Sequence, residues 1–181
     1  TVSVSVGNSV AQDTAGNLNT ASNTFNVSDN QNPTLASSTP TDNATGVAIN
    51  SNIVLTFNET VQAGTGNITL FKSDNTSVEV FDVTTDVTVS GATVTLDPAA
   101  SLDSLQGYYV QVASTAVKDT SNNAYAGISD TTTLSFTAAD VAAPTLASSS
   151  PADDATGVAV NSNIVLTFNE TVQAGTGNIT L

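Results

Sequence analysis

Side chains with hard oxygen ligands gather in three short polar segments of this chain, and two of the segments recur later. The residues are Asp29, Asn30, Glu59, Asp119 and Asn123, followed by Asp140 and Glu170. Calcium takes about six to eight oxygen ligands from carboxylates, amides and backbone carbonyls. No DxDxDG-type loop is present, so no single segment is a calcium site by itself. Metal binding therefore requires a fold that brings these segments together.

Asp119 and Asn123 also have a structural interpretation, because Asp and Asn side chains readily cap turns by bonding to nearby backbone groups. The polar pairs Asp42-Asn43 and Asp153-Asp154 each precede the tetrapeptide Ala-Thr-Gly-Val. We predict a turn there, with the glycine of the tetrapeptide at positive φ. A metal role for the adjacent carboxylates Asp153 and Asp154 is the alternative.

Histidine and cysteine are both absent from the sequence. A Ser-His or Cys-His nucleophile pair cannot be assembled without them, and the usual zinc ligands are reduced to carboxylates. We therefore expect a protein that is not an enzyme and that has no catalytic residues. The absence of cysteine also excludes disulfides, which is compatible with a bacterial surface protein and with many other proteins.

The net charge of the chain limits the classes of partner that it could bind. Sixteen acidic residues and only two basic ones give a net charge of -14, although just 10% of residues are charged. Nucleic acids and anionic membranes are recognised by basic patches, so neither is an expected partner, whereas cations are. No apolar run approaches the length of a membrane-spanning helix, and we expect no direct membrane insertion in this segment.

Apolar and polar residues alternate in short runs, which is typical of half-buried β-strands. The residues expected to form the core are Ile53, Leu55, Phe57, Val94, Leu96, Tyr108, Val110 and Phe136. Turn signals separate seven or eight such strands within about 108 residues, as in an immunoglobulin-like Greek-key sandwich. The fold class predicted is therefore all-β, as tandem immunoglobulin-like Greek-key β-sandwiches. One short helical turn could form within 98–105, with Leu102 and Leu105 closing one end of the core.

A block of sequence occurs twice. Residues 32–70 return as residues 143–181 with only five of 39 positions changed, which gives a period of 111 residues. A period of this length is that of a whole β domain. We therefore expect the end of one repeat in 1–31, a complete repeat in 32–140 and the beginning of the next in 141–181. The linkers are short, and Pro33 and Pro144 restrict the chain where each repeat starts, so the array should be a semi-rigid rod.

Tyr108 follows Gly107 at the start of a late strand. This placement is that of the tyrosine corner of Greek-key sandwiches, in which the phenol hydroxyl anchors a crossover. An ordinary core aromatic is the alternative interpretation.

The assembled motifs resemble the bacterial Ig-like domain of the Big_5 type. They are PTL, ATGVAxNSNIVLTFNETVQAGTGNITL, TVTLDP, GYYVQV, KDTSNNAYAGI and TTTLSFT. Domains of this kind occur in SwmB-like giant cell-surface proteins and in repetitive bacterial adhesins. The resemblance implies an Ig-like sandwich that acts mainly as a spacer and carries no catalytic residues to transfer.

An Ig-like topology would place the linker with Asp29 and Asn30, the loop with Glu59, and the turn 119–123 at one pole of the domain. We therefore predict Ca²⁺ at the domain junctions, with Asp140 and Glu170 at the next one. The partners expected are neighbouring Ig-like repeats of the same chain.

The function expected is structural extension of a giant extracellular bacterial adhesin, at the cell surface or secreted, in adhesion, biofilm or a filament. The alternative is self-association into a filament or surface layer, with domains completed by strand exchange. Carbohydrate binding is a third possibility, which the absence of tryptophan disfavours.

Overall fold

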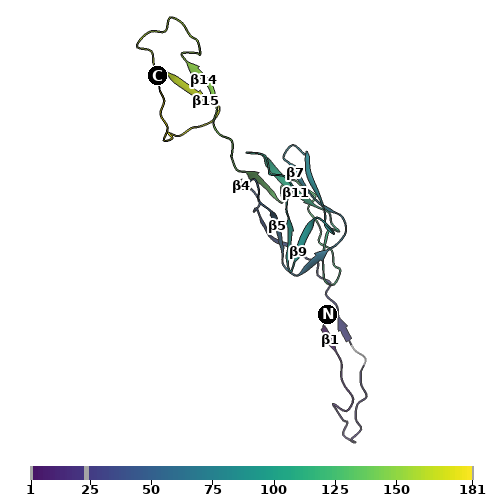
Figure 1. Ribbon diagram of the computed structural model, residues 1–181. Coiled ribbons are helices and arrows are strands. Elements are labelled where there is room, and N and C mark those ends of the chain that lie inside the picture. The colour runs from purple at the N-terminus through teal and green to yellow at the C-terminus, as the bar shows by residue number, and fades with distance from the viewer. Residues whose placement is uncertain (1, 23–24, 181) are drawn as a thin grey trace. The chain divides into compact units, whose positions relative to one another are not determined.

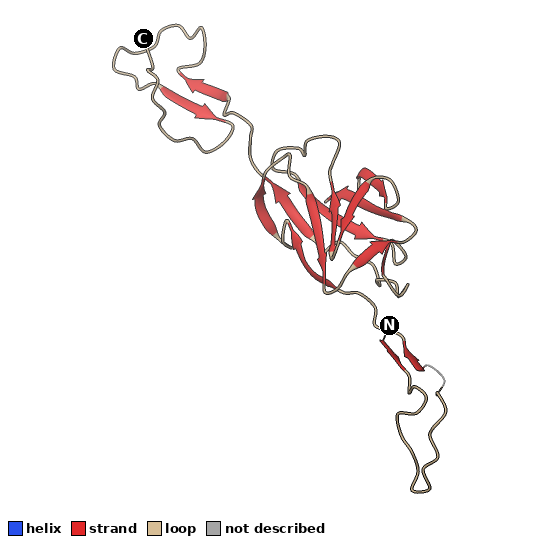
Figure 2. Ribbon diagram, turned by 60° about the horizontal axis from the view of Figure 1, so that its bottom comes forward, coloured by secondary structure: helices blue, strands red, loops and turns tan. Residues whose placement is uncertain are grey.

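The computed structural model describes residues 2–22 and 25–180 of the 181-residue chain. The chain divides into two compact units, residues 1–140 and 141–181. All regular structure in the described ranges is β-strand, so the predicted all-β class is confirmed (Figure 2). No helix among the described residues is long and apolar enough to cross a membrane.

Unit 1 begins with a hairpin. Strands β1 (Val2–Val4) and β2 (Phe25–Val27) pair antiparallel. A turn between them is capped by Asp13, whose Oδ1 accepts hydrogen bonds from the backbone N–H groups of Ala15 and Asn17, both at 2.9 Å.

The rest of unit 1 is a β-sandwich (Figure 1). One sheet has the order β3-β5-β10-β9 and the other has the order β4-β13-β11-β7-β8. All neighbouring strands pair antiparallel except β4 and β13, which are parallel. The strands of the first sheet are β3 (Leu35–Thr39), β5 (Ile53–Phe57), β9 (Val87–Ser90) and β10 (Thr93–Leu96). Those of the second are β4 (Ala44–Val47), β7 (Asn67–Lys72), β8 (Ser77–Asp82), β11 (Gly107–Val112) and β13 (Ser135–Ala138).

A short ladder joins β6 (Val61–Ala63) to β12 (Val117–Asp119) beside the two sheets. Together with β4, this ladder brings the number of described strands in the sandwich above the seven or eight predicted. The additional strands are only three or four residues long, too short for an alternating pattern to reveal them.

The predicted core is confirmed. Exposed fractions are 0% for Ile53, Leu55, Leu96 and Val110, 1% for Val94, 2% for Tyr108, and 3% for Phe57 and Phe136. Two aromatic contacts lie among the buried residues, with Phe57 edge-on to Tyr125 at 5.2 Å and Tyr108 stacked on Phe136, its neighbour across β11 and β13, at 5.6 Å. Burial of these side chains stabilises the sandwich without disulfides.

The tyrosine corner is present. The hydroxyl of Tyr108 accepts a hydrogen bond from the backbone N–H of Asp103 at 2.8 Å, so Tyr108 has both roles that the sequence suggested. The predicted helical turn at 98–105 is absent from the structure, and only half of the prediction for its leucines is right. Leu102 is buried, but Leu105 is 62% exposed because a tight turn places it at φ 59°, facing away from the core.

Unit 2 contains a single strand pair, β14 (Leu146–Ser150) with β15 (Val165–Phe168). Its register, Leu146 opposite Phe168 and Ser150 opposite Val165, is the register of β3 and β5 shifted by 111 residues. The predicted turns are also confirmed in both units, with Gly46 at φ 68° and Gly157 at φ 70°.

Gly64 is required by a close backbone approach. A Cβ at this position would lie 2.0 Å from the carbonyl oxygen of Thr115, and the Gly64 N–H donates to the carbonyl of Ala116 at 2.8 Å. Gly64→Ala should therefore lower the free energy of unfolding by about 1–3 kcal/mol. Gly175→Ala is the matched control, since nothing lies within 4 Å of a Cβ there. If the two variants had the same midpoint of urea denaturation, the approach of the Gly64 backbone to Thr115 would not restrict this position to glycine.

Candidate metal centre

The centre lies at the end of the sandwich where the chain enters it from β2. Asp29 is in the linker before β3, Glu59 follows β5, and Asp119 ends β12. One carboxylate oxygen from each of these three residues lies within 4.8 Å of the others. Three segments that are far apart in the sequence therefore form a group that could hold a metal ion.

Asp119 is the fixed member of this group. It is 1% exposed, and its Oδ1 accepts hydrogen bonds from the backbone N–H groups of Ser121 and Asn123, both at 2.8 Å. The Asn123 side chain donates to Oδ2 at 2.7 Å. Desolvation raises the pKa of Asp119, but the hydrogen bonds from Asn123 and the other turn groups outweigh it and hold the pKa below its usual value. Asp119 is thus an ionised turn cap whose carboxylate also faces the other two acids.

Asn123 connects the turn to the linker. Its Nδ2 also donates to the backbone carbonyl of Asp29 at 3.1 Å. The nitrogen of this amide, rather than its oxygen, is thus turned towards Asp29 and Asp119, which makes Asn123 a positioning residue for both. The side chain of Asn30 accepts a hydrogen bond from Gln31 at 3.2 Å.

Glu59 is the member of this group whose ionised form is destabilised by its surroundings. Desolvation raises the pKa of this half-buried carboxyl group, and the charges of Asp29 and Asp119 raise it further. A cation between the three carboxylates would remove the repulsion. The donor set consists of hard oxygens, which suits calcium or magnesium rather than a soft metal.

The second predicted pair lies in two different units. Asp140 is in unit 1, where its Oδ1 accepts a hydrogen bond from Ser104 Oγ at 3.1 Å. Glu170 is half-buried in unit 2. Each residue is the counterpart of a member of the first group, Asp29 or Glu59, shifted by 111 positions.

The capped turn of the centre has a second copy in the chain. Asn17 donates to Asp13 from its backbone and from its side chain, at 2.9 and 2.8 Å, as Asn123 does to Asp119. The shared sequence signal is Asp followed four residues later by Asn. Gln62 was not expected at the centre. It donates from Nε2 to the carbonyl of Asp119 at 2.7 Å, and no sequence motif marks it.

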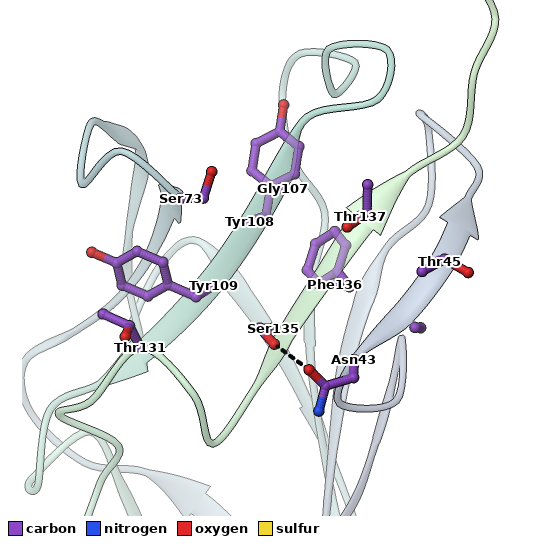
Figure 3. A pocket seen from close by; sticks show the side chains of 11 residues that line it. Asn43, Thr45, Ser73, Gly107, Tyr108, Tyr109, Thr131, Ser135, Phe136 and Thr137 are labelled. Carbon is purple, nitrogen blue, oxygen red and sulfur yellow. Dashed lines mark hydrogen bonds between the residues drawn. The ribbon is translucent and has the colours of Figure 1, made fainter.

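A hollow of about 400 Å³ lies over β4, β13 and β11 (Figure 3). Its eleven lining residues are all uncharged at neutral pH. At one side of the hollow, Ser135 Oγ donates a hydrogen bond to Asn43 Oδ1 at 3.4 Å. Tyr109 in its wall is 5% exposed and stacks on Phe71 at 5.0 Å. A ring so covered offers little surface on which a sugar could stack, so the hollow does not favour carbohydrate binding.

The two sheets and the tyrosine corner define an immunoglobulin-like β-sandwich protein. More specifically, the chain belongs to the Bacterial Ig-like domain family Big_5, whose model matches residues 29–138 and again residues 140–181. The second match begins 111 residues after the first. The family places the chain among bacterial surface-associated structural domains, which are typically not enzymes.

No curated protein sequence matches this chain. Among solved structures, the crystal structure of CopC from Methylosinus trichosporium OB3b is similar to this chain. The likeness covers 61% of this chain and 97% of CopC, with a TM-score of 0.45 and 14% identical residues.

Proposed function

We propose that this chain is part of a tandem array of extension domains in a giant bacterial adhesin, at the cell surface or secreted. In this role the domains hold a distal binding module away from the cell. The observation that carries the proposal is the 111-residue recurrence, which the sequence block, the two family matches and the registers of β3–β5 and β14–β15 share.

The path of the chain through the sandwich supports this role. The chain enters at the end where Asp29 contacts Asn123. It leaves along β13, whose last residue, Ala138, lies beside Val47 at the end of β4, at the opposite end of the sandwich (Figure 1). A domain with its two connections at opposite ends adds its whole length to an array, whereas one with adjacent termini adds little.

Calcium at the entry point is the second part of the proposal. Asp29, Glu59 and Asp119 would hold the ion, which supplies positive charge and ties the linker to the sandwich. The raised pKa of Glu59 and the ionised, buried Asp119 support a site that would favour a cation. Asp140 and Glu170 would contribute to the same joint one repeat later, so that the partners of each domain are its neighbours.

Glu59→Gln tests the calcium site in two directions. Without metal, the variant should melt at a higher temperature than the unmodified chain, because it removes a repelled carboxylate. With calcium, the order should reverse, because the variant has lost a ligand. Asp97→Asn is the control for total charge, since Asp97 is exposed and outside the group. A variant that responds to calcium as the unmodified chain does would contradict the site.

The same site predicts a pH dependence. The folded pKa of Glu59 lies above its ordinary value of 4.5, so the folded protein binds this proton more tightly than the unfolded protein does. Without metal, the stabilising effect of protonation therefore appears as the pH falls through the raised pKa of Glu59 and is complete only below 4.5, the ordinary value. The melting temperatures of the unmodified chain and of Glu59→Gln should therefore converge as the pH is lowered from 7 to 4.5.

The extension role itself can be tested in the cell. Deleting complete 111-residue copies from the gene should shorten the reach of the distal module in steps of one domain, measured by electron microscopy of the labelled cell surface. A reach that does not change with copy number would exclude the spacer role.

A further inference from the structure

The strand pair β4–β13 joins the two ends of the chain's path through the sandwich. β4 lies parallel to β13, and Figure 3 shows both strands with Asn43 and Ser135 facing each other. A backbone hydrogen bond closes each end of the pair. The N–H of Asn43 donates to the carbonyl of Ser135, and the N–H of Ala139 donates to the carbonyl of Val47, both at 2.7 Å. Residues 48–134 therefore form a loop of chain that this pair closes.

Asp42 adds a side-chain link at one end of the pair. Its Oδ1 accepts hydrogen bonds from the backbone N–H and the hydroxyl of Ser135, at 2.9 and 3.0 Å. Hydrogen bonds to a carboxylate are stronger than those between neutral groups. The block that returns at 143–181 retains this residue as Asp153. Asp42 thus ties the first part of the domain to its last strand, besides taking part in the turn before β4.

The directions of the strands decide how this pair carries tension. Leu35 lies opposite Phe57 at the pole where the chain enters, and β3, β4 and β13 all run from that pole towards the other. Tension applied through the two linkers therefore draws β4 back towards the entry and draws β13 towards the exit. The two strands are sheared along their length, so the hydrogen bonds that cross between them are loaded together rather than one after another.

From this geometry we propose that residues 42–47 and 135–139 form a clamp that keeps the domain folded under tension. While the clamp is intact, residues 48–134 lie outside the path of the force and carry no load. β3 precedes the clamp, so its detachment from β5 would release a short segment and leave the loop closed. This use of the clamp rests on the proposed extension role, because a spacer that is held at both ends is under tension.

The surroundings of β13 favour this role. Phe136 and Ala138 are 3% and 2% exposed, and hydrogen bonds so shielded from water are electrostatically stronger. β11 pairs with the other side of β13, and the N–H of Ala138 donates to the carbonyl of Gln106 at 3.0 Å. Because β13 is fixed from both sides, it cannot follow β4 when the linkers are pulled apart. Separation must therefore break the bonds of the clamp itself.

Optical tweezers can load this clamp selectively. The chain has no cysteine, so the full chain carrying Q31C/V141C, two substitutions at exposed linker positions, has unique attachment points for DNA handles. Asp29 lies outside the stretched segment, and chelator is present throughout, so the result does not depend on calcium. Opening of the clamp should appear as a step of roughly 300 Å, the extended length of residues 48–134 at about 3.5 Å per residue.

Asp42→Ala in this protein should shorten the lifetime of the folded domain at constant force about tenfold. Asp82→Ala is the matched control, because Asp82 Oδ1 also accepts from the N–H and the hydroxyl of one residue, Thr84, at 2.8 and 2.6 Å. Asp82 lies inside the closed loop. Both substitutions should lower the midpoint of urea denaturation, but Asp82→Ala should leave the lifetime under force unchanged. Ala139→Pro removes the backbone bond to Val47 and should shorten the lifetime, as Asp42→Ala does.

Equal lifetimes of Asp42→Ala and Asp82→Ala under force, whether both shortened or both unchanged, would overturn the clamp. A step much shorter than roughly 300 Å would do so as well, because the domain would then open elsewhere first. Failure of the clamp is distinguishable from failure of the extension role, which the deletion of 111-residue copies tests. A distal module whose reach ignored copy number would exclude the spacer and leave the measured lifetimes as they are.

Discussion

Phe57→Ala is expected to lower the free energy of unfolding of the sandwich by about 3–5 kcal/mol. Phe57 is 3% exposed and packs edge-on against Tyr125, so the substitution removes buried apolar surface and leaves a cavity. Phe168→Ala changes the counterpart 111 residues later, which lies half-buried in unit 2, and should leave the stability of the sandwich within about 0.5 kcal/mol of its original value.

The measurement is urea denaturation followed by tyrosine fluorescence. All three tyrosines, Tyr108, Tyr109 and Tyr125, lie in the sandwich, and tryptophan is absent, so the signal reports on unit 1. Equal losses of stability in the two variants would show that residues 143–181 are part of the same cooperative unit.

Asp119→Asn is expected to abolish the stabilisation by calcium. A ligand at about a hundred times its dissociation constant stabilises a protein by about 2.7 kcal/mol, and this whole increment should disappear. Asparagine keeps an oxygen that can accept from the N–H groups of Ser121 and Asn123, so the turn should survive in part. The readout is the difference in melting temperature between calcium and chelator.

Asp13→Asn is the matched control for this substitution, because Asp13 caps the same kind of turn but is outside the acidic group. Its calcium response should equal that of the unmodified chain. If Asp119→Asn retained a full response, Asp119 would be a turn cap alone and the calcium proposal would fail.

The core of the sandwich was predictable from sequence because each central strand alternates cleanly. Ile53, Leu55 and Phe57 are all buried, as period two requires. Leu105 was predicted wrongly because two leucines three positions apart fit a helical turn as well as a crossover. The backbone at φ 59°, which directs Leu105 outwards, depends on how the crossover is held by Tyr108 and by the carbonyl of Ile49.

The acidic group was predictable only through topology. Asp29, Glu59 and Asp119 share no motif, and they converge because β3, β5 and β12 have ends at the same pole. Sequence gave no indication of how deeply Asp119 is buried or that Gln62 bonds to its carbonyl, since both depend on the β6–β12 ladder. Metal binding by Asp140 and Glu170 at the next joint stays a prediction.

Small-angle scattering from a protein of three complete repeats, recorded in calcium and then in chelator, tests the central claim most directly. If calcium holds the domain junctions, the particle should be elongated in calcium. Its maximum dimension should shorten, and its melting temperature should fall, when the metal is removed. A particle with the same dimensions and melting temperature in both conditions would show that the joints are set by packing alone and that the acidic group is not a metal site.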